Sequence, residues 1–120
     1  FAEAQKNCDK KFGLRGGHLA EPQTAERSAE LNTYAREILN NENYFWIGYD
    51  DLGHGQGNFR YSSTDTVSNI NVKGFNGGGQ IDGADGESCA AFDQTSASNY
   101  GYVDDKYCTN AYSSICEWKK

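Results

Sequence analysis

Tyr44-Phe45-Trp46-Ile47-Gly48-Tyr49 is a nearly continuous run of aromatic and β-branched residues, which predicts a β-strand. Upstream of it, the spacing of apolar residues predicts two helices, over 1–12 and 24–39, and Thr24 is placed to cap the second one. Downstream, short apolar or alternating runs predict three further strands, at 58–62, 88–92 and 113–118. Because the helices come first and the strands follow, we expect an α+β fold with the helices packed on the sheets.

The chain is small and acidic. Its 120 residues suffice for one domain, and 17 acidic residues against 11 basic ones give a net charge of −6. A negative surface repels phosphates, which argues against nucleic acid and anionic membranes as partners. No apolar run approaches the roughly 20 residues needed to span a bilayer, and no signal peptide is recognisable. We therefore expect a single domain over 1–120 with no nucleic-acid and no membrane partner.

The four cysteines indicate disulfides. Neither a C-x-x-C pair nor a Cys/His alternation is present, so zinc and thioredoxin-type sites are not indicated. An even number of cysteines in a small chain favours two disulfides and an oxidising compartment, which predicts secretion. Sequence alone permits three pairings of Cys8, Cys89, Cys108 and Cys116.

Residues 74–86 are rich in glycine and acidic side chains and show no helix or strand period. A loop of this composition is costly to order, because glycine loses more conformational freedom on folding than any other residue. A bound cation would offset that cost, and loops of this length are usually functional.

A series of short motifs appears in fixed order along the whole chain: GGHLAE at 16–21, WIGY at 46–49, GNFRY at 57–61, GESC at 86–89, YVDDKYC at 102–108 and SICE at 114–117. In order and spacing they resemble the C-type lectin-like domain family. The resemblance implies two helices packed on two small antiparallel sheets, a long Gly-rich loop region, and the pairing that we favour, Cys8 with Cys116 and Cys89 with Cys108. Family members carry a strand before the first helix, and we expect that strand to be missing here.

The resemblance also implies a calcium site. In the family a loop tripeptide, a glutamate just before the third cysteine and an acidic or amide pair before the fourth hold the ion. The matching residues in this chain are Gln80, Asp82, Glu87, Asp104 and Asp105. Four carboxylates and one amide suit calcium, which takes about six to eight oxygen ligands. Residues 82–87 do not match an EF-hand, because they lack its alternating ligands and its terminal glutamate.

Sugar binding would follow from the same atoms, since vicinal hydroxyls can coordinate the ion and hydrogen-bond to its carboxylate ligands. In the family, glutamine and aspartate in the tripeptide go with galactose-type sugars, which suggests galactose or N-acetylgalactosamine here. The predicted sugar-binding residues are Gln80, Asp82, Glu87, Asp104, Tyr100 and Tyr102, and Tyr107 is a further candidate for stacking on the sugar. We expect Trp46 and Trp118 to lie in the core and Asp51 to be an exposed turn residue.

Two other functions compete with a calcium-dependent lectin. A glycosidase could use Glu87, Asp104 and Asp105 as acid and base, but no nucleophile, metalloprotease or phosphate-loop motif is present, and we expect no enzyme. A lectin-like domain that binds a protein, mineral or ice surface without calcium is the other alternative, because Ile81 replaces the proline of the family's tripeptide. Single domains of the family bind sugars weakly, so avidity for glycans on glycoproteins or cell surfaces would need a homo-oligomer.

Overall fold

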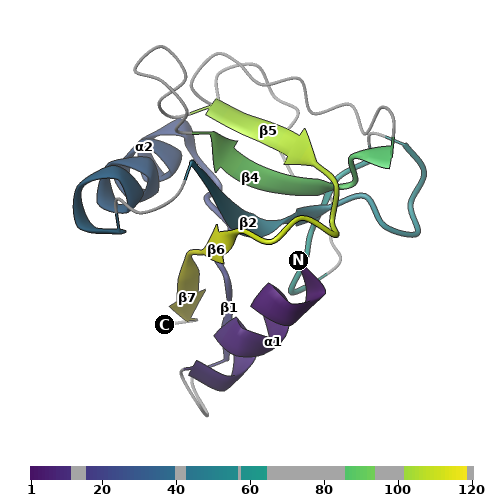
Figure 1. The fold of residues 1–120 in the computed structure, drawn as a ribbon, viewed down its shortest axis with the longest axis horizontal. Coiled ribbons are helices and arrows are strands. Elements are labelled where there is room, and N and C mark those ends of the chain that lie inside the picture. The colour runs from purple at the N-terminus through teal and green to yellow at the C-terminus, as the bar shows by residue number, and fades with distance from the viewer. Residues whose placement is uncertain (12–15, 40–42, 57, 65–85, 94–101, 119–120) are drawn as a thin grey trace.

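The computed structural model describes residues 1–11, 16–39, 43–56, 58–64, 86–93 and 102–118 (Figure 1). The helical segments are α1 (Ala2–Lys11), α2 (Ala25–Tyr34) and the π-helical turn η2 (Ala35–Leu39), which continues α2. The strands are β1 (Gly17–Leu19), β2 (Tyr44–Asp50), β3 (Arg60–Tyr61), β4 (Cys89–Asp93), β5 (Tyr102–Lys106), β6 (Ser113–Ser114) and β7 (Cys116–Trp118).

The strands form two sheets. In the larger one the order is β3-β2-β4-β5, with antiparallel neighbours throughout, and β6 pairs with β2 in parallel. The smaller sheet is the antiparallel pair of β1 and β7. Figure 1 shows β2, β4 and β5 side by side, with α1 and α2 on different sides of them. The expected α+β fold of two helices on two small sheets is confirmed.

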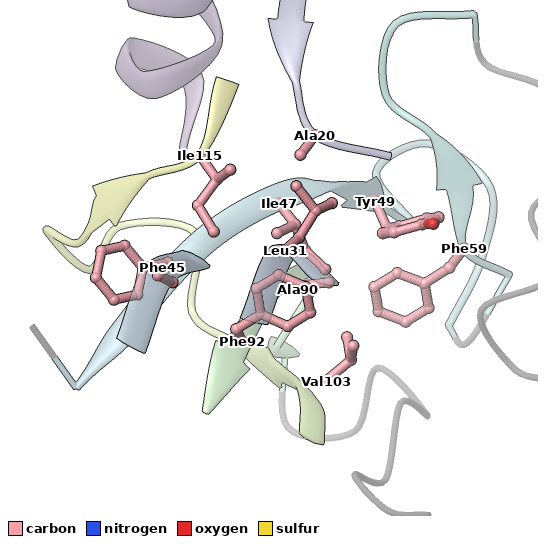
Figure 2. Close-up of a cluster of buried hydrophobic side chains, with 11 residues drawn as sticks. Ala20, Leu31, Phe45, Ile47, Tyr49, Phe59, Ala90, Phe92, Val103 and Ile115 are labelled. Atoms are coloured by element: carbon pink, nitrogen blue, oxygen red, sulfur yellow. The ribbon is translucent and has the colours of Figure 1, made fainter. Parts of the chain in front are cut away.

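Strand β2 divides the hydrophobic core because successive side chains point to opposite faces. On one face Phe45, Ile47 and Tyr49 pack in a cluster with residues of α2, β4 and β5 (Figure 2). On the other face Trp46 packs with residues of α1 and β4. These elements add Leu31, Ala90, Phe92 and Val103 on the first face and Ala4, Cys8, Cys89 and Ala91 on the second, where Phe1, just before α1, also packs.

Two disulfides close the fold, and both have the expected pairing. Cys8 of α1 is bonded to Cys116 of β7 across a sequence separation of 108 residues, and Cys89 is bonded to Cys108 across 19. The first bond ties the first helix to the last strand. The second ties the beginning of β4 to the residues that follow β5, and so holds the region of the predicted site together.

Most of the expected elements are present, with bounds shifted by one or two residues. Thr24 caps the second helix as expected, since its Oγ1 accepts a hydrogen bond of 3.1 Å from the backbone N–H of Arg27. The prediction of one strand over 113–118 is wrong, because β6 and β7 belong to different sheets and the buried Ile115 lies between them. Strands β1 and β5 were not predicted.

Three side chains test the expected burial. Trp46 is buried as expected, with 1% of its surface exposed. The expectation that Trp118 lies in the core is wrong, since 44% of its surface is exposed at the end of β7. The expectation that Asp51 is an exposed turn residue is wrong, since only 4% of it is exposed. Its backbone N–H donates a 3.0 Å hydrogen bond to the carbonyl of Ser88, which packs the turn after β2 against the residues before β4.

Candidate functional site

The Cys89–Cys108 disulfide brings together the two segments that carry the predicted acidic ligands. Glu87 stands two residues before Cys89, where β4 begins, and it is half-buried. Strand β5 pairs with β4 so that Asp105 lies opposite Ala90 and Asp104 lies opposite Ala91. The Cα atoms of the two cysteines are 5.2 Å apart, so the segment of Glu87 is covalently held beside the strand of the two aspartates.

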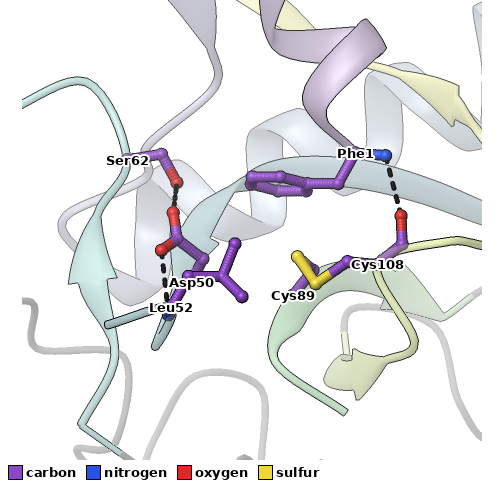
Figure 3. Close-up of a disulfide and its surroundings, with 6 residues drawn as sticks. All are labelled: Phe1, Asp50, Leu52, Ser62, Cys89 and Cys108. Carbon is purple, nitrogen blue, oxygen red and sulfur yellow. Dashed lines mark hydrogen bonds between the residues drawn. A yellow bond between two sulfur atoms is a disulfide. The ribbon is translucent and has the colours of Figure 1, made fainter. Parts of the chain in front are cut away.

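Figure 3 shows the surroundings of this disulfide. On one side the amino group of Phe1 donates a 3.0 Å hydrogen bond to the carbonyl of Cys108. At the end of β2, the carboxylate of Asp50 accepts hydrogen bonds from the hydroxyl of Ser62 and the backbone N–H of Leu52, at 2.6 and 3.2 Å. These bonds fix the turn after β2. The same turn is hydrogen-bonded through Asp51 to Ser88, the residue next to Glu87.

The two adjacent aspartates of β5 lie on opposite faces of the strand. Val103 and Asp105 lie on the face of β5 that packs in the cluster with Phe45, Ile47 and Tyr49. Both are buried, with 1% and 4% of their surfaces exposed. Asp104 is on the other face together with Lys106, as the two-residue period of a strand requires. The Oδ1 atom of Asp104 accepts a 2.9 Å hydrogen bond from the backbone N–H of Asp105.

Lys106 is a charged residue beside the predicted ligands that the sequence analysis did not single out. Its Nζ lies 3.3 Å from Oδ2 of Asp104 and 4.4 Å from the centre of the Tyr44 ring. Burial disfavours the charged lysine, but the negative charge and hydrogen bond of Asp104, together with Tyr44, outweigh that effect and raise the pKa of Lys106. The i, i+2 spacing of Asp104 and Lys106 was a signal for this pair, because it puts both side chains on one face of a strand.

The remaining predicted ligands and sugar contacts are only partly covered by the structure. Gln80, Asp82 and Tyr100 lie outside the described residues. Tyr102 is the first residue of β5 and pairs with Asp93. Tyr107, directly after β5, is 47% exposed and so is accessible to a ligand.

The described carboxylates fit calcium by donor chemistry, since Glu87, Asp104 and Asp105 offer the hard oxygen atoms that the ion prefers. Within the described ranges, however, no three His, Cys, Asp or Glu side chains come together closely enough to hold a metal. The predicted site also includes Gln80 and Asp82, which lie outside the described residues.

A cavity of about 500 Å³ lies elsewhere, between α1, β2 and the segment before β6. Trp46 and Tyr112 contribute aromatic rings to its lining, and Asn7 and Asn110 contribute amides. Glu87, Asp104 and Asp105 do not line it. The described residues of the predicted metal and sugar site therefore lie at β5 and its surroundings and not in this cavity.

Comparison with known proteins identifies the family. The model of the lectin C-type domain matches residues 1–118, and the chain belongs to this family, whose members are known for binding rather than catalysis. It is 29% identical over 118 residues to C-type lectin domain family 3 member A of Bos taurus and 28% identical to the homologous protein of Xenopus laevis. The match covers 98% of this chain but 54% of each relative, so the chain spans about half the length of these proteins.

Solved structures support the same fold. The C-type lectin CEL-I from Cucumaria echinata superimposes with a TM-score of 0.74 at 22% identity, over 96% of this chain and 79% of that one. The tunicate C-type lectin TC14 from Polyandrocarpa misakiensis gives a TM-score of 0.73 at 21% identity, over 99% of this chain and 89% of that one. At such identities the likeness establishes the fold alone. Among the described helices, none is long and apolar enough to cross a bilayer.

Proposed function

We propose that this chain is a calcium-dependent carbohydrate-binding module. Its calcium would be held by Gln80, Asp82, Glu87, Asp104 and Asp105, and two vicinal sugar hydroxyls would complete the coordination. The observation that carries the proposal is the Cys89–Cys108 disulfide, which holds the segment of Glu87 beside the strand of the two aspartates.

The position of β5 explains how neighbouring aspartates on opposite faces could serve one ion. Strand β5 is the last in the order β3-β2-β4-β5 of the described larger sheet. A ligand beside the outer edge of such a strand is accessible to side chains from both faces, and also to backbone carbonyls. Bound calcium would supply the charge that neutralises the carboxylates and a partner for the sugar oxygens.

The chain's own residues would select the sugar. Carboxylate oxygens that face the ligand accept hydrogen bonds from its hydroxyls, and such charge-assisted bonds are about twice as strong as neutral ones. Gln80 and Asp82 favour galactose or N-acetylgalactosamine by the family pattern. An exposed aromatic ring, of which Tyr107 is the described example, could stack on the apolar face of the sugar.

The test is retention on immobilised galactose with calcium present, followed by elution with EDTA. Free galactose should elute the protein at lower concentration than free mannose. Glu87→Gln removes one carboxylate charge with little change of shape and should weaken retention at least about tenfold, as expected when a charged hydrogen-bond or metal partner is lost. Glu26→Gln, on the exposed surface of α2, is the matched control and should bind like the wild type. Retention that EDTA does not alter would contradict the proposal.

A second candidate is a lectin-like domain that binds a protein, mineral or ice surface without calcium. The ion pair of Lys106 with Asp104 favours it, because a lysine already neutralises one of the predicted ligands. In that case EDTA would change neither ligand binding nor thermal stability, and the protein would not be retained on any sugar resin.

The disulfides favour an extracellular location, since such bonds persist in oxidising compartments. Glycans on glycoproteins or cell surfaces are the corresponding partners. Because single domains bind sugars weakly, avidity for such surfaces would require a homo-oligomer, which sedimentation of the purified protein would detect.

A further inference from the structure

We propose that Lys106 is a built-in competitor of calcium, so that the ion binds at β5 only by displacing the ammonium group from Asp104. The inference rests on the proposed function, because it concerns regulation of the same site. Lys106 would lower the calcium affinity and would keep the site neutralised when calcium is scarce.

The first observation behind this proposal is that two contacts hold the lysine in place. Its Nζ is 3.3 Å from Asp104 Oδ2 and 4.4 Å from the centre of the Tyr44 ring, so an ion pair and a cation–π contact act on the same ammonium group. Only 19% of the lysine side chain and 28% of the Asp104 side chain are exposed. Solvent therefore screens the pair less than it would screen an ion pair on the open surface.

The sheet provides the room for this arrangement. Tyr44 belongs to β2 and Lys106 to β5, and β4 runs between these two strands. The residue of β4 opposite Asp104 is Ala91, whose side chain is a single methyl group. The long side chains of Tyr44 and Lys106 can thus meet across the intervening strand.

The second observation is that both carboxylate oxygens of Asp104 already have a partner. Oδ1 accepts the backbone N–H of Asp105 at 2.9 Å, and Oδ2 faces the ammonium group. Calcium would have to share or replace one of these partners. Since two cations at one carboxylate repel each other, an ammonium group that stays in place disfavours the ion.

The experiment is calcium titration by calorimetry of the wild type, Lys106→Gln and Lys106→Arg, at one ionic strength and after removal of metal with a chelating resin. Lys106→Gln has a side chain one atom shorter that keeps a hydrogen-bond donor but loses the charge, and it should bind calcium about tenfold more tightly than the wild type. Lys106→Arg keeps the charge and should stay within about twofold. Near-ultraviolet circular dichroism verifies that both variants keep the native fold.

Stability in EDTA gives an independent readout. Without calcium, Lys106→Gln leaves the carboxylates unneutralised, so its melting temperature should fall below that of the wild type, and calcium should raise it by more than it raises the wild type. Equal calcium affinity of wild type and Lys106→Gln would overturn this inference and leave the proposed function intact. Absence of calcium binding in all three proteins would overturn both.

A double variant separates action through Asp104 from a general charge effect. In an Asp104→Asn background the ion pair is absent, so adding Lys106→Gln should improve calcium affinity by no more than about threefold. A gain that remains tenfold in this background would show that the lysine acts on the ion without Asp104, and it would overturn the displacement.

Discussion

Gly48 lies so close to Glu21 that a Cβ atom on this glycine would stand 2.7 Å from Glu21 Cγ and 2.8 Å from the carbonyl oxygen of Leu19. Two backbone hydrogen bonds hold the contact, from Gly48 N–H to Ala20 and from Ser62 N–H to Gly48, at 2.7 and 2.8 Å. One of the two clashing atoms belongs to the backbone and cannot turn away. The glycine of the 46–49 motif is therefore required by a close approach between β2 and the segment after β1.

Gly48→Ala should consequently destabilise the protein by about 2–3 kcal/mol, the cost of overpacking a well-filled site. Urea unfolding followed by tryptophan fluorescence measures this, since Trp46 is buried in the core. Gly53→Ala is the control: Gly53 has a φ of 78° but nothing within 4 Å of the added methyl group. The control should lose about 1 kcal/mol from backbone strain alone. A smaller loss in Gly48→Ala than in Gly53→Ala would contradict the close-approach argument.

Tyr49 makes the stability of the fold sensitive to alkaline pH. Its side chain is fully buried, and its hydroxyl donates a hydrogen bond to the carbonyl of Pro22. Burial, followed by the neighbouring Tyr61, Glu21 and Glu117, raises the pKa of Tyr49 well above its ordinary value of 10.0. The native state keeps this proton, whereas the unfolded chain releases it above pH 10. The contribution of Tyr49 to the free energy of unfolding is therefore fully present below pH 10 and is lost as the pH rises further.

Above pH 10 the wild type should lose about 1.4 kcal/mol of unfolding free energy per pH unit because of Tyr49. Tyr49→Phe should remove that part of the slope, at a cost of about 1 kcal/mol at neutral pH for the lost hydrogen bond. Denaturant unfolding between pH 8 and 11.5 measures both effects. Tyr107→Phe, at a 47% exposed position, should leave the slope unchanged. Equal slopes for wild type and Tyr49→Phe would disprove the assignment.

Local patterns predicted the elements that bury apolar residues, and β2 is the best example. Strand β5 escaped prediction because only Val103 among its inner residues is apolar, while its other buried side chain, Asp105, is a carboxylate that a sequence pattern assigns to the surface. The exposure of Trp118 was missed for a related reason. Its strand pairs with β1, and such long-range pairing is not encoded in the local sequence.

The acidic residues proposed for the site can be found in the sequence, but the contacts that the structure gives them cannot. The motif around Asp104 and Asp105 indicated calcium ligands, and the disulfide that tethers them to Glu87 was correctly expected. The contact of Lys106 with Tyr44 joins residues from strands that do not pair with each other. Only the register of three strands brings these two side chains together, so no pattern within one segment could have indicated it.

Calcium should stabilise the protein if the proposed site is correct. A ligand that binds only the native state at about 100 times its dissociation constant adds about 2.7 kcal/mol to the free energy of unfolding. Differential scanning calorimetry with calcium and with EDTA should therefore show a higher melting temperature with calcium. Magnesium should not replace it, because it demands short octahedral bonds and gives up water reluctantly. In Glu87→Gln most of the calcium effect should vanish; equal melting with calcium and EDTA in the wild type would favour the calcium-independent candidate.

The two disulfides should differ in what their loss does to the site. On the chain-entropy model, replacing Cys8 and Cys116 by alanine costs about 4.7 kcal/mol and replacing Cys89 and Cys108 costs about 3 kcal/mol, because the first bond closes the longer loop. Calcium affinity should show the opposite order. Only the second bond tethers the segment of Glu87 to the end of β5, so its removal should weaken calcium binding at least tenfold, whereas the Cys8–Cys116 variant, kept below its melting temperature, should bind calcium nearly as the wild type does. If both variants lost affinity equally, the tether would not be what assembles the ligands.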